Sequence, residues 1–228
     1  MGWKGFKDVQ ATILVDITPT SEEILSKVDR SRRKNIKKAI ESGLRFEEAK
    51  SEEEWVEWYN IYKKVWREGG IEYKKLEFFK KPNWNLFLVK LNEKMVGGGV
   101  FEELEDRIIF KAYASLIEYQ QYRINDFLYW SSFLYAKSKE KKKVDLGGWQ
   151  INAQGHLTGI NSFKEKWGGD IVYYNVYSKN PLYILGRKAI RNFAFIRWIW
   201  DRIKGRPFPK KSKSEQENNS GPELQKNS

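Results

Sequence analysis

The segment Val144-Asp145-Leu146-Gly147-Gly148, followed by residues 159–169 (GINSFKEKWGG), decides how we interpret this sequence. The first segment predicts a short buried strand that runs into a glycine-rich loop. The second predicts a short helix that ends at Gly168-Gly169. Glycine pairs indicate places where the backbone has positive φ or approaches another group closely. Lys164 lies between the two pairs, directly after Phe163, so we expect its ammonium group to face an anionic substrate or a developing oxyanion.

The composition limits the class of protein. The chain has 228 residues, of which 40% are hydrophobic and 15% aromatic, which is enough for the core of one domain with a tail. Cysteine is absent, so disulfides, cysteine metal ligands and a cysteine nucleophile are excluded. His156 is the one histidine, which argues against a histidine metal site. We therefore expect no metal and no bound cofactor.

The net charge of +12 is concentrated in two basic segments. Residues 27–38 hold seven basic residues against Asp29 alone, and residues 187–211 hold nine against Asp201 alone. Clusters of this density suit phosphates, nucleic acid or an acidic membrane face. Solubility and ordinary helix-surface charge are the alternative interpretation.

The hydrophobic pattern predicts a mixture of strands and helices. Strands are predicted at residues 11–17, 84–91, 95–101, 107–114, 144–146 and 170–177, and helices at residues 19–43, 51–69 and 119–139 and around Lys164. Within the predicted hairpin of residues 84–101, Gly97-Gly98-Gly99 suggests a bulge or a close ligand approach. The order of elements predicts an α/β (α+β) fold with a mixed, mostly antiparallel sheet flanked by helices, as in GNAT acyltransferases.

Three blocks of the sequence, spread over residues 12–181, resemble the FemABX aminoacyltransferases. They are Asp145–Gly148 with Gly159–Lys164 and Trp167–Gly169, the basic segment Arg33–Ala39 with Gly43, and Tyr113-Ala114-Ser115 followed by an aromatic helix with Trp130. The resemblance implies the GNAT fold and an enzyme that adds amino acids from aminoacyl-tRNA to peptidoglycan precursors. Typical members carry two such domains, whereas this chain has room for one, which resembles the second.

The resemblance leaves the acceptor open. In the family, the first domain grips most of the acceptor precursor. Relatives in the same superfamily transfer acyl groups in polysaccharide and other envelope pathways. The expected acceptor is therefore an amine of a cell-envelope precursor, of which peptidoglycan is one type.

We divide the chain into three parts. These are a GNAT-like acyltransferase domain (1–181), a basic aromatic C-terminal helix (182–204) and a disordered tail (205–228). Residues 187–211 resemble an interfacial membrane helix, and the alternative is a helix that docks its apolar side on the core. No stretch reaches the roughly 18 apolar residues of a membrane span, and the N-terminus lacks a secretory signal. We expect a cytoplasmic protein with peripheral contact at the inner face of an anionic membrane.

Lys164 is the expected catalytic residue. The resemblance implies that the lysine of this Phe-Lys pair holds the tRNA terminus or the charge that forms at the reacting ester. Aminolysis of an ester creates an oxyanion, and a preplaced cation stabilises that oxyanion more than the neutral ground state. The alternative is a solvated helix lysine, like Lys166 two residues further on.

Three other residues near these motifs are expected to bind substrate. Phe163 is expected to stack on the terminal adenine of a donor, or else to be a core aromatic. Tyr113 lies where the resemblance implies a substrate-facing tyrosine, and a structural strand tyrosine fits equally. Asp145 orients a backbone loop or accepts a proton, and the structural role is favoured.

Phosphates of tRNA, of a nucleotide-linked acceptor or of a lipid pyrophosphate are expected to bind to basic residues of the first helical region, unless these are merely solvated: Arg30, Arg33, Lys34, Lys37 and Lys38. His156 fits a general base less well than an incidental loop histidine. Gly97-Gly98-Gly99 leaves room for a pantetheine chain. However, no glycine-rich pyrophosphate loop follows it, which disfavours acyl-CoA as the donor.

The sequence thus predicts an N-acyltransferase of FemABX type. The acceptor amine is expected to attack the donor directly, because a cysteine and a Ser-His pair are both lacking. The expected partners are aminoacyl-tRNA, a lipid- or nucleotide-linked envelope precursor, an anionic membrane and a second copy of the chain in a homodimer. Two alternatives stay open: a non-catalytic RNA- or membrane-binding module with the same fold, and an acyl-CoA-dependent GNAT acetyltransferase.

Overall fold

The structure is a computed structural model that describes residues 6–69, 72–182 and 185. Its strands are β1 (Phe6–Asp16), β2 (Arg45–Glu48), β3 (Trp84–Leu91), β4 (Lys94–Glu103), β5 (Arg107–Ser115), β6 (Lys143–Trp149) and β7 (Asp170–Ser178). Its α-helices are α1 (Ser21–Lys27), α2 (Arg30–Glu41), α3 (Glu52–Glu68), α4 (Ile124–Ser138) and α5 (His156–Glu165), with short 3₁₀ helices at Leu76–Phe78 and Ile117–Tyr122. Apart from Leu182 and Leu185, the predicted C-terminal helix and tail lie outside the described residues.

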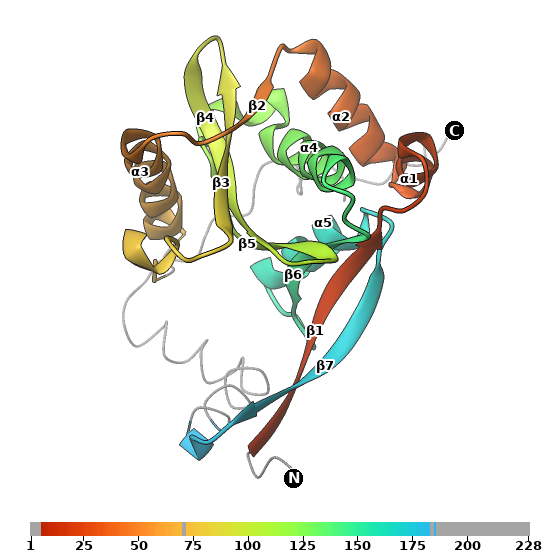
Figure 1. The fold of residues 1–228 in the computed structure, drawn as a ribbon, viewed down its shortest axis with the longest axis vertical. Coiled ribbons are helices and arrows are strands. Elements are labelled where there is room, and N and C mark those ends of the chain that lie inside the picture. The colour runs from red at the N-terminus through yellow and green to blue at the C-terminus, as the bar shows by residue number, and fades with distance from the viewer. Residues whose placement is uncertain (1–5, 70–71, 183–184, 186–228) are drawn as a thin grey trace, which may run out of the picture.

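The strands form one sheet in the order β2-β3-β4-β5-β6-β1-β7 (Figure 1). Five of the neighbouring pairs are antiparallel, and β5 with β6 is parallel. The mixed, mostly antiparallel sheet predicted from the sequence is therefore confirmed. Among the described helices, none is long and apolar enough to cross a bilayer.

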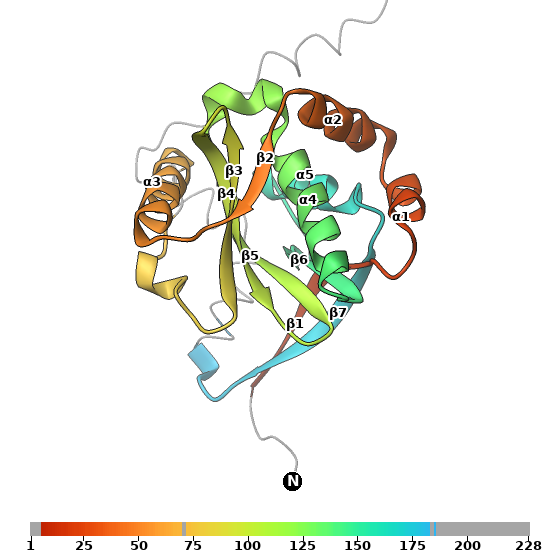
Figure 2. The ribbon, with the colours of Figure 1, turned by 45° about the horizontal axis from the view of Figure 1, so that its top comes forward.

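Helices cover both faces of the sheet, with α3 on one side and α1, α2 and α4 on the other (Figure 2). On the α3 side, Trp58 and Tyr62 are buried in one cluster with Leu88. On the opposite side, Phe133 and Trp167 belong to a larger cluster. Burial of apolar area in these two clusters is the main stabilising contribution to the fold.

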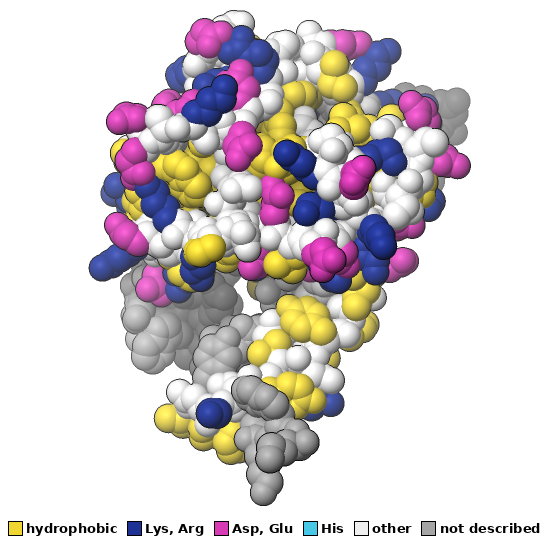
Figure 3. Space-filling view, in the orientation of Figure 1, with side chains coloured by type: hydrophobic (Ala, Val, Ile, Leu, Met, Phe, Trp, Pro, Cys, Tyr) yellow, Lys and Arg dark blue, Asp and Glu magenta, His cyan; other side chains and the backbone are white. Residues whose placement is uncertain are grey.

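β1 and β7 form a long antiparallel ribbon that extends away from the rest of the sheet (Figure 1). Its register runs from the pair Phe6 and Ser178 to the pair Leu14 and Asp170. Hydrophobic side chains remain exposed along it, including Tyr173, and they appear in yellow in Figure 3. β1 thus joins this exposed ribbon to the strand that carries the glycine pair.

Several predicted elements differ from the structure. β1 begins at Phe6, five residues before the predicted strand of residues 11–17. The helix predicted over residues 19–43 is two helices, because Val28 has an extended backbone and the Asp29 carboxylate accepts a hydrogen bond from the Ser31 amide at 2.9 Å, which caps α2. The helix predicted from residue 119 begins at Ile124, after Arg123 in a left-handed conformation (φ 60°). The short edge strand β2 was missing from the sequence prediction.

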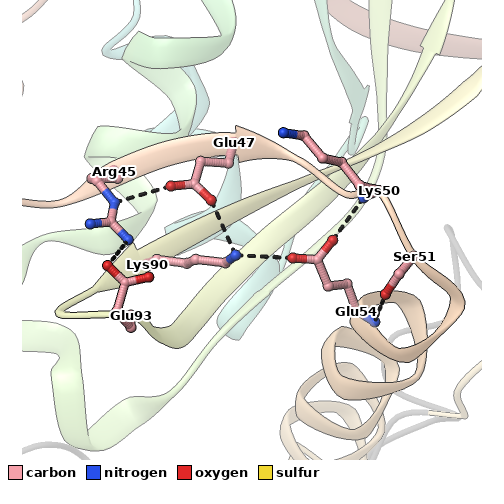
Figure 4. A network of polar contacts seen from close by, with 7 residues as sticks. All are labelled: Arg45, Glu47, Lys50, Ser51, Glu54, Lys90 and Glu93. Atoms are coloured by element: carbon pink, nitrogen blue, oxygen red, sulfur yellow. Dashed lines mark hydrogen bonds and ion pairs between the residues drawn. The ribbon is translucent and has the colours of Figure 1, made fainter.

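A network of ion pairs fixes β2 and α3 to the sheet (Figure 4). The Lys90 ammonium contacts Glu54 at 2.9 Å and Glu47 at 3.1 Å, and Arg45 contacts both Glu47 and Glu93. Hydrogen bonds to the Lys50 amide and to Lys90 hold the pKa of Glu54 below its usual value. The network thus adds side-chain contacts to β2, which pairs with β3 over only four residues.

Candidate functional site

The candidate site lies where β5 and β6 diverge. These strands pair in parallel over only three residues, from Arg107 with Lys143 to Ile109 with Asp145. Beyond that point β5 continues along β4, while β6 continues along β1. Two strands that separate within a sheet leave backbone groups free of ladder hydrogen bonds, and such groups are then available to other partners.

Gly147 forms a β-bulge at this divergence. Thr12 faces Gly148 and Leu14 faces Asp145 in the β1–β6 register, so β6 carries one residue more than β1 between these pairs. Gly147 has φ +73°, and a Cβ atom there would lie 2.9 Å from the Phe110 carbonyl oxygen. Glycine is therefore required both by backbone conformation and by space. The glycine loop predicted from the sequence is in fact part of strand β6.

α5 brings the Lys164 side chain to this bulge. The residue is only 7% exposed, and its ammonium group donates a hydrogen bond to the Gly148 carbonyl oxygen at 2.9 Å. Burial lowers the pKa of Lys164 to about 8, although the Asp145 carboxylate acts in the opposite direction. The alternative interpretation as a solvated helix lysine is wrong. A buried ammonium next to diverging strands suits stabilisation of negative charge.

The Asp145 carboxylate is hydrogen-bonded to both β6 and β1. Its carboxylate accepts a hydrogen bond from the Gly147 amide at 2.8 Å, and the Thr12 hydroxyl donates to the same oxygen. This geometry agrees with the favoured expectation that Asp145 orients the backbone. Both hydrogen bonds are accepted by Oδ1, and they fix the orientation of the carboxylate.

Phe163 is half-buried and packs against the core. Its ring lies edge-on to Tyr129 with centroids 5.0 Å apart, and the Arg32 guanidinium lies 5.1 Å from its centroid. The ring thus contacts α4 and α2, and it remains half-buried. This arrangement favours the core-aromatic interpretation, because stacking on an adenine would require Arg32 to move away.

Tyr113 belongs to the same aromatic group. It is half-buried on β5, and its ring lies edge-on to Tyr129 at 5.7 Å. Burial raises the pKa of Tyr113, so the phenol stays neutral and is available as a hydrogen-bond donor. Tyr129 is fully buried and connects Tyr113 to Phe163. The structure thus brings Lys164, Asp145, Phe163 and Tyr113 into one region.

The predicted phosphate-binding residues of α2 lie on the exposed face of the helix: Arg30, Arg33, Lys34, Lys37 and Lys38. The inner face carries Ile36 and Ala39, which are buried. The exposed cations remain accessible to a large anionic partner.

Sequence reasoning missed a buried polar cluster between α2 and α4. Arg32 contacts Asp126 at 2.9 Å, and the Asn35 amide donates to the other carboxylate oxygen of Asp126 at 3.2 Å. Burial raises the pKa of Asp126, opposed by Arg32. The helical period could have predicted the inward direction of these side chains. Arg32 and Asn35 lie one turn before Ile36 and Ala39, on the same face of the helix.

His156 begins α5, and its side chain lies outside the described part of the structure. Among the described residues, no group of three or more His, Cys, Asp or Glu side chains is arranged to hold a metal ion. The groups gathered at the bulge are a cation, a carboxylate and aromatic side chains. These groups suit binding and charge stabilisation in acyl transfer.

The model of the FemAB family matches residues 2–83. This chain resembles the FemABX family. The crystal structure of FemX has a TM-score of 0.64 at 15% identity, with 77% of this chain and 63% of that chain covered. No curated protein matches the sequence. The family match supports the expectation of an acyltransferase.

Two other solved structures have related folds. The C-terminal domain (DUF2156) of a putative lysylphosphatidylglycerol synthetase from Agrobacterium fabrum has a TM-score of 0.61 at 12% identity, covering 82% of this chain and 66% of that chain. L-PGS from Bacillus licheniformis has a TM-score of 0.57 at 15% identity, covering 79% and 65%. At these identities the likeness concerns the fold, and it confirms the predicted fold class. The chain spans less than two thirds of the length of these three structures.

Proposed function

We propose that this chain is an N-acyltransferase of FemABX type, which moves an aminoacyl or related acyl group from aminoacyl-tRNA to an amine of an envelope precursor. One observation carries the proposal: the buried Lys164 ammonium sits on the Gly148 carbonyl where β5 and β6 diverge. The family match over residues 2–83 supports the same class of enzyme. The acyl-CoA alternative loses support, because atoms of Phe87, Ala114 and Ile124 lie where side chains of the β4 glycines would extend.

The proposed reaction is aminolysis of an ester. The acceptor amine attacks the carbonyl carbon, and the carbonyl oxygen becomes an oxyanion. The oxyanion then reforms the carbonyl group, the bond to the donor's ester oxygen breaks, and the proton lost by the amine ends on that oxygen. The products are an amide and the free terminal hydroxyl of the tRNA. The Lys164 ammonium has three N–H donors, of which the Gly148 carbonyl takes one. Two N–H groups remain for the oxyanion. Their burial strengthens the interaction relative to water.

Two further substrate assignments belong to the proposal. The exposed cations of α2 bind tRNA phosphates or an anionic membrane, and this binding weakens as salt rises. The acceptor is a lipid- or nucleotide-linked precursor at the cytoplasmic face of the membrane. A lipid acceptor has added support, since one structure of similar fold is named as a putative lysylphosphatidylglycerol synthetase. A homodimer would supply a second domain of this fold.

Removal of the Lys164 charge tests the proposal. The protein is incubated with charged tRNA pools and lipid-linked precursors, and products are measured by mass spectrometry. We expect Lys164→Met to lower the transfer rate about 10²- to 10³-fold, as for loss of one oxyanion donor. Lys166→Met, which changes the half-buried lysine two residues away, is the matched control. Transfer at the full rate by Lys164→Met would exclude this role.

The pH dependence gives a second test. Because the pKa of Lys164 is about 8, its cationic form disappears as pH rises through 8, and we expect kcat to fall over that range. Folding should respond in the opposite direction. Between pH 8 and the usual lysine pKa, the unfolded chain holds a proton that the folded chain has lost, so the free energy of unfolding rises with pH. Lys164→Met should abolish both effects.

The exposed cations of α2 also favour a second candidate, a non-catalytic module that binds RNA or membranes. Such a module would lose affinity through Arg33→Gln and Lys37→Gln, and Lys164→Met would leave its binding unchanged. Thermal shifts with tRNA, CoA and anionic vesicles identify the ligand in either case. Product formation separates the enzyme from the module.

A further inference from the structure

The bulge at Gly147 takes two backbone groups out of the regular β1–β6 ladder. Buried backbone N–H and C=O groups need other partners when a ladder is interrupted. The Gly147 amide donates a hydrogen bond to the Asp145 carboxylate at 2.8 Å. The Gly147 carbonyl oxygen lies 3.0 Å from the Thr12 hydroxyl oxygen. Side chains of Asp145 and Thr12 therefore replace the missing ladder bonds.

Thr12 is placed for this task by β1. It is 6% exposed, and it faces Gly148 across the strand pair. Its hydroxyl oxygen is within hydrogen-bonding reach of both the Asp145 carboxylate and the Gly147 carbonyl. A threonine hydroxyl has one hydrogen, which these two oxygens share. One side chain of β1 thus holds both ends of the bulge.

We propose that Thr12 is a positioning residue for Lys164: its hydroxyl fixes the bulge and thereby the Gly148 carbonyl that receives the Lys164 ammonium. Gly148 follows the bulged residue directly. A change in the backbone angles of Gly147 would therefore move the Gly148 carbonyl away from the Lys164 ammonium. The ammonium hydrogen bonds to Gly148 at 2.9 Å and would lose that partner. For the reaction itself, this inference rests on the proposed function.

The geometry distinguishes Thr12 from another threonine on the same segment. The Thr18 hydroxyl donates a hydrogen bond to the Asp16 carboxylate at 2.8 Å, and both residues are exposed. Among the described contacts, neither side chain forms a hydrogen bond to β6. The two Thr–Asp pairs are chemically alike. Only the pair of Thr12 and Asp145 is connected to the bulge and, through it, to Lys164. Thr18→Val is therefore the matched control for Thr12→Val.

The test measures the side-chain pKa of Lys164 by NMR in lysine-labelled protein, together with the pH–rate profile. Thr12→Val keeps the branched shape and removes the hydroxyl. We expect the pKa to rise from about 8 toward that of a solvated lysine as the amine is released toward water, and kcat to fall at least tenfold. Thr12→Ser restores the hydroxyl and should restore both values. Thr18→Val should change neither.

An unchanged Lys164 pKa and pH–rate profile in Thr12→Val, relative to Thr18→Val, would overturn the inference. Should Thr12→Val not fold, Thr12→Ala is measured in the same way, because it demands less space. The NMR measurement needs no turnover, so it remains valid if the wild-type protein transfers no acyl group. In that outcome the proposed function fails while the positioning by Thr12 is still decided.

Discussion

Two glycine runs look alike in the sequence but have different structural roles in the fold. Gly97-Gly98-Gly99 lies within β4, and Gly147-Gly148 lies near the end of β6. In β4, a Cβ atom on Gly98 would lie 2.5 Å from the Phe87 carbonyl oxygen and 3.0 Å from Trp58. In β6, Gly147 has positive φ, and a Cβ atom on Gly148 would meet nothing within 4 Å.

The difference shows what glycine contributes in each place. The β4 glycines let neighbouring strands and helices pack closely, with no left-handed backbone among them. Gly147 instead permits a bulge that redirects the backbone, and Gly148 presents its carbonyl to Lys164. The pairing register also breaks on both sides of the β4 glycines, at Val96 and between Val100 and Phe101, so a register break alone does not separate the two runs. The positive φ of Gly147 does separate them.

The largest loss of stability is expected from Gly98→Ala. The new methyl group would meet backbone atoms of β3, which cannot move without disturbing the ladder. We expect a loss of about 3 kcal/mol in the free energy of unfolding, measured by urea denaturation. Gly159→Ala is the control, because its Cβ meets nothing and α5 should gain about 0.5–1 kcal/mol. A neutral Gly98→Ala would show that β4 is less tightly packed than described.

Gly147→Ala should have the next largest effect on stability. Its positive φ and the approach to the Phe110 carbonyl together should lower the free energy of unfolding by about 2 kcal/mol. In contrast to Gly98→Ala, it should also move the Lys164 pKa and reduce transfer in the protein that remains folded. If Gly147→Ala altered stability without any change at Lys164, the bulge would be separate from the site.

Gly148→Ala should have the smallest effect. The added methyl group enters open space, and the carbonyl that binds Lys164 is retained. We expect a change within about 0.5 kcal/mol in unfolding free energy and the same Lys164 pKa, by denaturation and NMR. A loss above that range would mean that the glycine pair acts as one unit and that the contrast between its two members is wrong.

Much of the fold was predictable from local pattern. The alternation in residues 107–114 and the Ser51 cap of α3 gave elements close to those observed. The break at Asp29 was missed, because the apolar stripe continues across it and only the capping geometry separates α1 from α2. β2 was missed because a strand of four residues, two of them exposed and two half-buried, carries little pattern, and its partner strand β3 begins about 40 residues later.

The site was predictable only in part. Lys164 stood out because glycines flank it, and its burial agrees with that reading. Thr12 gave no signal, since its partner Asp145 is 133 residues away in the sequence. A β-bulge is defined by how two strands pair, so the sequence of one strand does not reveal it. Arg32 was hidden among exposed cations, although its helical position relative to Ile36 indicated an inward direction.

The place of β1 in the sheet also dictates when the site can assemble. β1 is formed by the first described residues, yet both of its neighbours, β6 and β7, come from the last strands. During synthesis, its hydrogen-bonding edges stay unpaired until residues 143–178 have been made. Such distant pairing slows folding and exposes strand edges to wrong partners. Nascent chains stopped before β6 should therefore need chaperone protection. The Lys164 ammonium can bind the Gly148 carbonyl only after β6 has paired with β1.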